Sequence, residues 1–253
     1  MNFDISNLLN QWEYQPGQVL VRKFKSKEGV EKIQLRVDLG ILQMNAEGRP
    51  DGKRPFGHES LLEHYQARLE QFRTEKRGEG EGFKLKHEDC SRLQQEAIQY
   101  YHRYICLFQM GDFAGVVRDT KRNLKVFDFV AQNAESEEMA WALQQFRPQL
   151  LMMQTRAHGT LELQKGNHDE AIKLVEAGMD EIREFHRQQN RQDSLEPSVE
   201  IHSLELWLQE LQAKRPLSER ERLQMDLDDA VGREDYEKAA RVRDALRNLK
   251  SSQ

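Results

Sequence analysis

The sequence feature that most constrains the fold is the apolar pattern that runs from Ser218 to Gly232, close to the C-terminal end. Ser218 and Glu221 stand three residues apart and form a capping box, which predicts that a helix starts here. Gly232 is expected to end this helix in the left-handed conformation. The apolar residues between these ends recur at i, i+4, i+7 and i+8 and so share one helical face: Leu223, Leu227, Ala230 and Val231.

A second helix with its own apolar face is predicted after a short reversal at residues 233–235. Ala239 and Ala240 are small enough to let two helices cross closely. The two patterns together predict a helical hairpin over residues 216–250. The apolar residues of the second helix are spaced by three or four positions, as in a coiled-coil seam: Tyr236, Ala239, Val242, Leu246 and Leu249.

This segment resembles the UVR motif, which is named after the excision-repair proteins UvrB and UvrC. The resemblance implies a bacterial protein whose hairpin pairs with a similar hairpin or docks a partner, as in the Clp ATPases and their McsA-type adaptors. The chain lacks the paired Cys-x-x-Cys zinc sites of McsA. Val242 stands where the family usually has Leu or Ile. The positions that match the motif are Leu223, Leu227, Ala230, Glu234, Asp235, Tyr236, Glu237, Ala239, Ala240, Arg243, Asp244, Leu246 and Leu249.

The hairpin is predicted to need a covering partner, because two helices of about 13 to 15 residues are marginal in isolation. Arg243 and Asp244 are expected to set the polar register of that contact. The alternative is that the hairpin packs on the preceding helix, near Leu204, Trp207, Leu208 and Leu211. The predicted partner-binding residues, for another protein or for a second copy of the chain, are Leu223, Leu227, Val231, Tyr236, Ala239, Val242, Arg243, Leu246 and Leu249.

The middle of the chain, residues 91–213, is predicted to be an array of helical hairpins. Turns at Gly111-Asp112 and Gly166-Asn167 share a glycine followed by Asp or Asn, which resembles the turn of tetratricopeptide (TPR) repeats. Pro148 should kink or split the helix between them, and a polar break is expected from Gln188 to Pro197. The array is therefore predicted to be TPR-like, with an irregular bundle as the alternative.

The first 77 residues are predicted to form an α+β unit, so the whole chain is α+β but mostly α. Strand-like patterns run from Val19 to Phe24 and from Ile33 to Leu39, and Gly40 to Met44 supplies a third strand of a small antiparallel sheet. A loop over residues 45–57 precedes a helix over 59–77. The glycine-rich stretch that follows predicts a linker and helix start at 78–90.

The loop over residues 45–57 offers Arg49, Lys53 and Arg54 as a possible recognition site. It does not match a phosphate-binding loop, because the spacing of its glycines is one residue short and Arg54 replaces the required Ser or Thr. A second alternative makes this N-terminal unit a ligand-binding or catalytic domain built on Asp38, Arg49, Asp51 and His58. The cluster from His87 to Cys90 is expected to be a polar helix cap, and no metal or cofactor is expected.

Composition favours an interaction protein of the reducing cytoplasm. The 38 basic and 43 acidic residues give a net charge of -5, so no bulk positive field attracts nucleic acid. The two cysteines, Cys90 and Cys106, match no zinc or redox spacing, and the start Met1 to Asp4 does not resemble a signal peptide. No apolar run predicts a membrane span.

These observations predict a non-catalytic adaptor that acts through the C-terminal hairpin and the helical array. No helicase P-loop, nuclease motif or Clp ATPase core accompanies the hairpin in this sequence. The main alternative is an accessory factor of nucleotide excision repair that touches DNA and recruits a repair protein. That alternative requires a basic face that the overall composition conceals.

Overall fold

The computed structural model describes residues 4–75, 82–189, 198–217 and 219–251, and it divides the chain into two compact units. The first unit is Met1–Leu206 and the second is Trp207–Gln253. Residues 78–81 of the predicted linker and helix start, residues 190–197 of the predicted polar break and the capping residue Ser218 lie outside the described residues. No helix within the described ranges is both long enough and apolar enough to cross a membrane.

The predicted N-terminal sheet is confirmed. Strands β1 (Leu20–Lys25), β2 (Glu31–Val37) and β3 (Gly40–Asn45) form one antiparallel sheet in sequential order, after the short helix α1 (Ser6–Asn10). The register places Leu35 opposite both Val21 and Leu42, so apolar side chains of the three strands share one face.

The sheet is not a separate domain, because one hydrophobic core joins it to the helices that follow. The core contains Ile33 and Met44 from the sheet, Tyr65 from helix α2 (Leu61–Glu75), and Leu93 and Val126 from the array. A short 3-10 turn, Pro55–Gly57, precedes α2. The predicted boundary at 78–90 therefore divides the sequence but not the folded core, and the structure keeps both sides in one unit.

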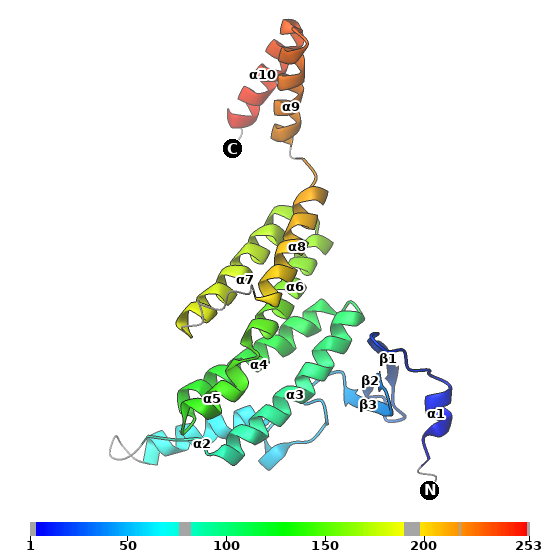
Figure 1. Cartoon of the computed structure of the whole chain (residues 1–253), viewed down its shortest axis with the longest axis vertical. Coiled ribbons are helices and arrows are strands. Elements are labelled where there is room, and N and C mark those ends of the chain that lie inside the picture. The colour runs from blue at the N-terminus through cyan, green and yellow to red at the C-terminus, as the bar shows by residue number, and fades with distance from the viewer. Residues whose placement is uncertain (1–3, 76–81, 190–197, 218, 252–253) are drawn as a thin grey trace. The chain divides into compact units, whose positions relative to one another are not determined.

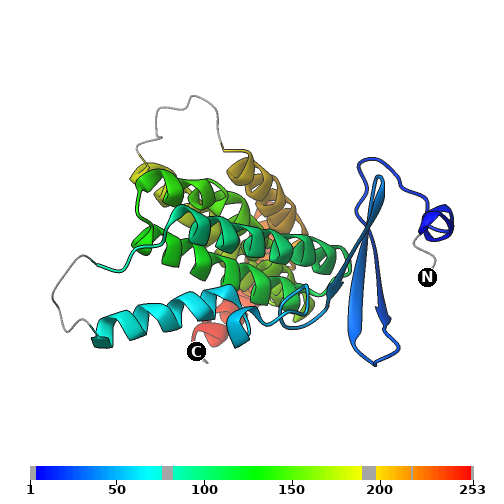
Figure 2. The ribbon, with the colours of Figure 1, turned by 90° about the horizontal axis from the view of Figure 1, so that it is seen from below.

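The middle region is helical, as predicted, and its long helices pack on one another in the order of the sequence, with the short helix α5 inserted between α4 and α6. Helices α3 and α4, α4 and α6, and α6 and α7 pack on one another (Figures 1 and 2). Its TPR-like character stays a prediction. The helices are α3 (His87–Gln109), α4 (Phe113–Asn133), α5 (Glu137–Gln144), α6 (Arg147–Gln164), α7 (His168–Gln188) and α8 (Val199–Lys214), and the last of these contains the boundary between the two units.

Both predicted turns of the array close with the same hydrogen bonds. Gly111 has a φ of 76° and donates to the Phe108 carbonyl at 3.1 Å, while Asp112 donates to the Leu107 carbonyl at 2.9 Å. Gly166, at a φ of 81°, ends α6 in the same way. This is the Schellman arrangement, in which the left-handed residue lets the last free carbonyls of a helix accept hydrogen bonds.

Helix α5 lies between α4 and α6 in the sequence, and Pro148 lies in the first turn of α6 rather than in the middle of one long helix. The prediction that proline splits this region is therefore correct. The break between α4 and α5 was not predicted from the sequence. Ser136 starts α5 there by accepting a hydrogen bond from the Met139 amide at 3.3 Å, as a serine N-cap does.

Candidate functional site

The C-terminal hairpin consists of helices α9 (Glu219–Gly232) and α10 (Tyr236–Ser251), which pack on each other (Figure 1). The two buried apolar residues among those described in these helices are small, Ala230 and Ala239. Small residues at these positions permit a close crossing near the turn. The larger seam residues are only half-buried: Leu223, Leu227, Val242, Leu246 and Leu249.

The turn of the hairpin differs from the prediction. Gly232 is the last helical residue of α9, and Glu234 rather than glycine takes the left-handed conformation, with a φ of 59°. Glu234 donates to the Val231 carbonyl at 3.0 Å and Asp235 to the Ala230 carbonyl at 2.8 Å. The turn is thus the same Schellman arrangement as in the array, shifted two residues beyond the predicted glycine, because Arg233 still bonds to the Asp229 carbonyl at 3.0 Å.

The shifted turn also starts the second helix. The Asp235 carboxylate accepts a hydrogen bond from the Lys238 amide at 3.0 Å, and Asp112 accepts one from Gly115 in the same way before α4. Asp235 is therefore the N-cap of α10. The reversal lies at residues 233–235, as predicted. The capping role of Asp235 was not predicted, although the pair Glu234-Asp235 matches the Gly111-Asp112 turn with glutamate in place of glycine.

Two substitutions in this turn test which residue is left-handed. Glu234→Gly is expected to stabilise the hairpin by roughly 1 kcal/mol, because a side chain in the left-handed region is strained. Gly232→Ala is expected to stabilise it by about 0.5–1 kcal/mol, because alanine is the better helix former and nothing lies within 4 Å of the added carbon. Thermal unfolding of the full chain, followed by circular dichroism, measures both effects. A destabilised Gly232→Ala protein would contradict the observed turn.

The predicted partner-binding residues occupy three different environments. Ala239 is buried inside the hairpin, so it closes the helix pair and offers little surface to a partner. Val231 and Tyr236 are 53% and 70% exposed, and Arg243 is exposed as well. Met225, which is not among the predicted residues, is 59% exposed. The remaining predicted residues form the half-buried seam.

The two helices of the hairpin carry opposite charges. In the sequence, α9 has five acidic and two basic residues, whereas α10 has two acidic and five basic residues. The ion pairs seen in the hairpin are mostly local and exposed, such as Arg233–Asp229 at 3.0 Å and Arg243–Asp244 at 3.6 Å. Such pairs add little stability, so the uneven charge is available to orient a charged partner.

The predicted recognition loop is only partly exposed. The Arg49 side chain is 11% exposed, and its Nε donates to Glu96 at 2.7 Å while its guanidinium also pairs with Asp51 at 2.8 Å. Arg49 is therefore held by two carboxylates in this structure, and its part in recognition stays a prediction. Lys53 and Arg54 are exposed, and Arg54 pairs with Glu59.

The other candidate chemistry is dispersed in the structure. Arg49 and Asp51 form an ion pair, whereas the His58 ring packs against the His64 ring, with 5.3 Å between the two ring centroids. The cluster from His87 to Cys90 starts α3 as expected, since Asp89 accepts a hydrogen bond from the Lys86 amide at 3.1 Å. Among the residues that the structure describes, no group of three or more His, Cys, Asp or Glu side chains could hold a metal ion.

Comparison with protein families identifies the hairpin. The family model for the UvrB/uvrC motif, UVR, matches residues 218–252, which covers α9, the turn and α10. No curated protein matches the chain. No solved structure matches it either. The C-terminal hairpin is therefore a UVR motif, a module for interaction with proteins or DNA.

Proposed function

We propose that this protein is a non-catalytic adaptor that binds a protein partner through the α9–α10 hairpin and offers its helical array as a second docking surface. The observation that carries the proposal is the UVR match on a hairpin that leaves its seam half-buried and Val231 and Tyr236 exposed. An apolar seam of this kind gains stability when a partner removes it from water. Two docking surfaces on one chain can bring two proteins together.

The charge distribution of the hairpin supports a helical partner. A partner helix that runs along the seam lies beside the acidic α9 on one side and the basic α10 on the other. Complementary charges would then select the orientation of the bound helix and speed the encounter. A second copy of the chain has this arrangement, so self-association through the hairpin fits the proposal, as does a different protein with a helix of complementary charge.

The test uses exposed positions, so that loss of binding is not a loss of folding. We expect the double variant Val231→Ser, Tyr236→Ala to lose the partner or the self-association of the wild-type chain. Binding is measured by quantitative affinity capture from a cell lysate and by light scattering for molecular mass. The expected loss is at least about tenfold, because two central apolar contacts of an interface contribute about 1–2 kcal/mol each.

The matched control removes two apolar side chains of similar exposure elsewhere. Leu39 and Val199 are 88% and 79% exposed and lie in the first unit. The variant Leu39→Ser, Val199→Ser should bind as the wild type does. Equal capture and equal mass for all three proteins would reject the hairpin as the docking site.

The basic charge of helix α10 is the observation that favours the alternative, DNA binding. Its five basic residues provide the local positive charge that the net composition hides. If the chain binds DNA through this helix, Arg241→Gln, Arg243→Gln should weaken binding to a short duplex and reduce its salt dependence. The adaptor would be favoured if the variant still binds its protein partner and the wild-type chain shows no measurable binding to the duplex.

A further inference from the structure

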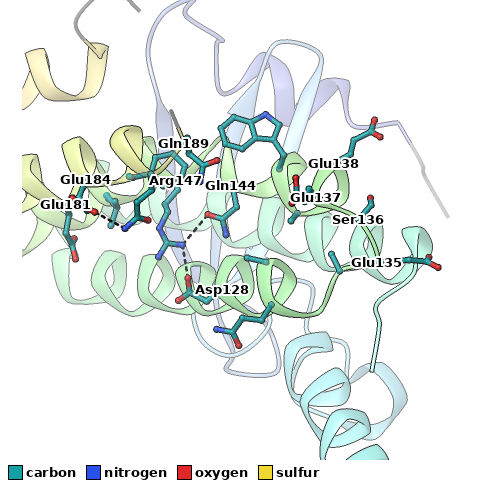
Figure 3. Close-up of a pocket in the computed structure, with 18 of the residues that line it drawn as sticks. Asp128, Glu135, Ser136, Glu137, Glu138, Gln144, Arg147, Glu181, Glu184 and Gln189 are labelled. Carbon is teal, nitrogen blue, oxygen red and sulfur yellow. Dashed lines mark hydrogen bonds and ion pairs between the residues drawn. The ribbon is translucent and has the colours of Figure 1, made fainter. Parts of the chain in front are cut away.

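A broad groove lies in the first unit, far along the sequence from the UVR hairpin. Its volume is about 1090 Å³, and it is formed by the end of α4, by α5, by the start of α6 and by the C-terminal part of α7 (Figure 3). Charged lining residues from α4 to α7 are Asp128, Glu135, Glu137, Glu138, Arg147, Glu181 and Glu184, and Lys84 adds an eighth.

The groove is strongly acidic, with six carboxylates against two basic side chains. Both basic groups are engaged: Lys84 donates to the Ala134 carbonyl at 3.5 Å, and Arg147 pairs with Asp128 at 2.7 Å and contacts Gln144 at 3.4 Å (Figure 3). Glu184 pairs with Arg187. The ion pairs within the described ranges leave four lining carboxylates without a basic partner: Glu135, Glu137, Glu138 and Glu181.

An aromatic pair lies in the wall of the same groove. The rings of Trp141 and Phe185 are nearly parallel, with an angle of 8° between their planes and 6.4 Å between their centroids. Trp141 is half-buried, so part of its surface remains accessible. A tryptophan face attracts a guanidinium group by the cation–π interaction, and arginine stacks on such a face better than lysine does.

We propose that this groove binds an arginine-rich segment of a protein partner. The inference rests on the proposed function in one respect, since it takes the helical array as a docking surface and names the chemistry of its ligand. The unpaired carboxylates supply acceptors for guanidinium groups, and bidentate arginine–carboxylate bonds add both energy and direction. Trp141 supplies the aromatic face that distinguishes arginine from lysine.

The size and spread of the groove favour a peptide segment over a metal ion. Its carboxylates come from α4, the α4–α5 connection, α5 and α7, and no cluster in the described residues meets the requirement for three metal ligands. An extended basic segment spans several such carboxylates at once, whereas one ion needs them converged on a point. The open groove accommodates the chain of a peptide as well as its side chains.

The test measures binding of hexa-arginine to the full chain by isothermal titration calorimetry. We expect saturable binding that weakens as salt is added, because exposed charge interactions are screened. The groove variant Glu137→Gln, Glu138→Gln, Glu181→Gln removes three charges and leaves the side-chain shapes nearly unchanged. It should weaken binding by about fivefold or more, because three exposed pairs between a carboxylate and an arginine are lost.

The matched control removes the same number of charges from exposed positions outside the groove. In Glu13→Gln, Glu28→Gln, Glu176→Gln the net charge changes equally, while no lining residue of the groove is altered. Binding should stay within about twofold of the wild type. An equal loss in the groove and control variants would show attraction to net charge alone and would overturn the proposal, as would the absence of binding to the wild type.

The aromatic contribution has its own readout, the ratio of hexa-arginine to hexalysine affinity. The wild type should prefer arginine, and Trp141→Ala should remove most of this preference while some binding of both peptides remains. Trp141→Phe keeps an aromatic ring against Phe185 and should retain part of the preference for arginine. This variant keeps the test valid if the alanine variant does not fold. Equal affinities of the wild type for both peptides would reject Trp141 as a specificity residue.

Two further titrations test whether calcium occupies the groove and whether peptide binding to the groove is independent of the hairpin. Calcium ions alone should give no saturable heat, and displacement of hexa-arginine by calcium at equal concentration would overturn the peptide assignment. The hairpin variant Val231→Ser, Tyr236→Ala should bind hexa-arginine as the wild type does. Loss of peptide binding in that variant would contradict the groove, and loss of the hairpin partner alone would leave the groove assignment intact.

Discussion

Replacing Asp119 with alanine is expected to lower the free energy of unfolding of the first unit by about 3–5 kcal/mol. Arg103 and Asp119 are each 1% exposed and form two hydrogen bonds, at 2.7 and 2.8 Å. The same guanidinium donates to the carbonyls of Asn45 at 3.1 Å and Gly48 at 2.7 Å. The alanine variant would leave a buried positive charge without its carboxylate. Chemical denaturation followed by circular dichroism measures the change.

An exposed ion pair beside this one supplies the control. Glu47 is 76% exposed and pairs with Arg118 at 2.7 Å, and Arg118 also contacts Asp119 at 2.9 Å. Glu47→Ala should reduce the stability by less than about 1 kcal/mol, because water already solvates both groups. If Glu47→Ala and Asp119→Ala reduce the stability equally, burial is not what makes the inner pair important.

Local sequence signals predicted the elements of this fold well. Alternating apolar residues around Ile33 and Leu35 predicted strands, and the glycine turns at Gly111 and Gly166 predicted the ends of two helices. The UVR motif was recognised from apolar spacing and a few polar positions of the hairpin, and the family comparison confirms it. Each of these signals depends on residues within about one helical turn or one strand of each other, where the periodicity of the chain decides which side chains share a face.

Local sequence patterns do not predict features that depend on small energy differences or on residues far apart in the chain. Gly232 is the residue with the lowest cost in a left-handed conformation, yet continuation of α9 to Gly232 places Glu234 there instead. Arg49 looked like an exposed loop residue because its partner Glu96 is 47 positions away. No spacing rule relates such residues until the helices are packed.

The acidic groove shows the same limit for a candidate site. Its lining residues lie between Lys84 and Gln189 and belong to several helices. In the sequence, Glu137 and Glu138 are explained as favourable charges in the first turn of a helix. Trp141 and Phe185 come together only when α5 packs against α4 and α7 takes its place in the fold. The same packing gathers the carboxylates around one concave surface.

The buried carboxylate of Glu96 leads to the second large prediction, a loss of about 3–5 kcal/mol on substitution by alanine. The Glu96 side chain is 0% exposed and pairs with both Arg49 and Arg122. It also accepts a hydrogen bond from the Leu61 amide at 2.9 Å, which fixes the start of α2. Burial and the nearby charge of Arg49 lower the pKa of Arg122 to about 9. Removal of the carboxylate would therefore leave two closely spaced cations and a free amide in a poorly solvated place.

Two readouts distinguish this role from a general loss of packing. Hydrogen exchange at the Leu61 amide should accelerate in Glu96→Ala more than exchange in α6 and α7, because the amide loses its acceptor while those helices keep theirs. Glu88→Ala is the control on the same helix, since the Glu88 side chain is 76% exposed and pairs with Arg92, one turn along the helix, at 2.6 Å. Its effect should stay near 0.5 kcal/mol or below. Uniform acceleration across the first unit would mean that Glu96 supports the whole core, whereas acceleration confined to the start of α2 identifies Glu96 as the anchor that joins the N-terminal loop to the helical array.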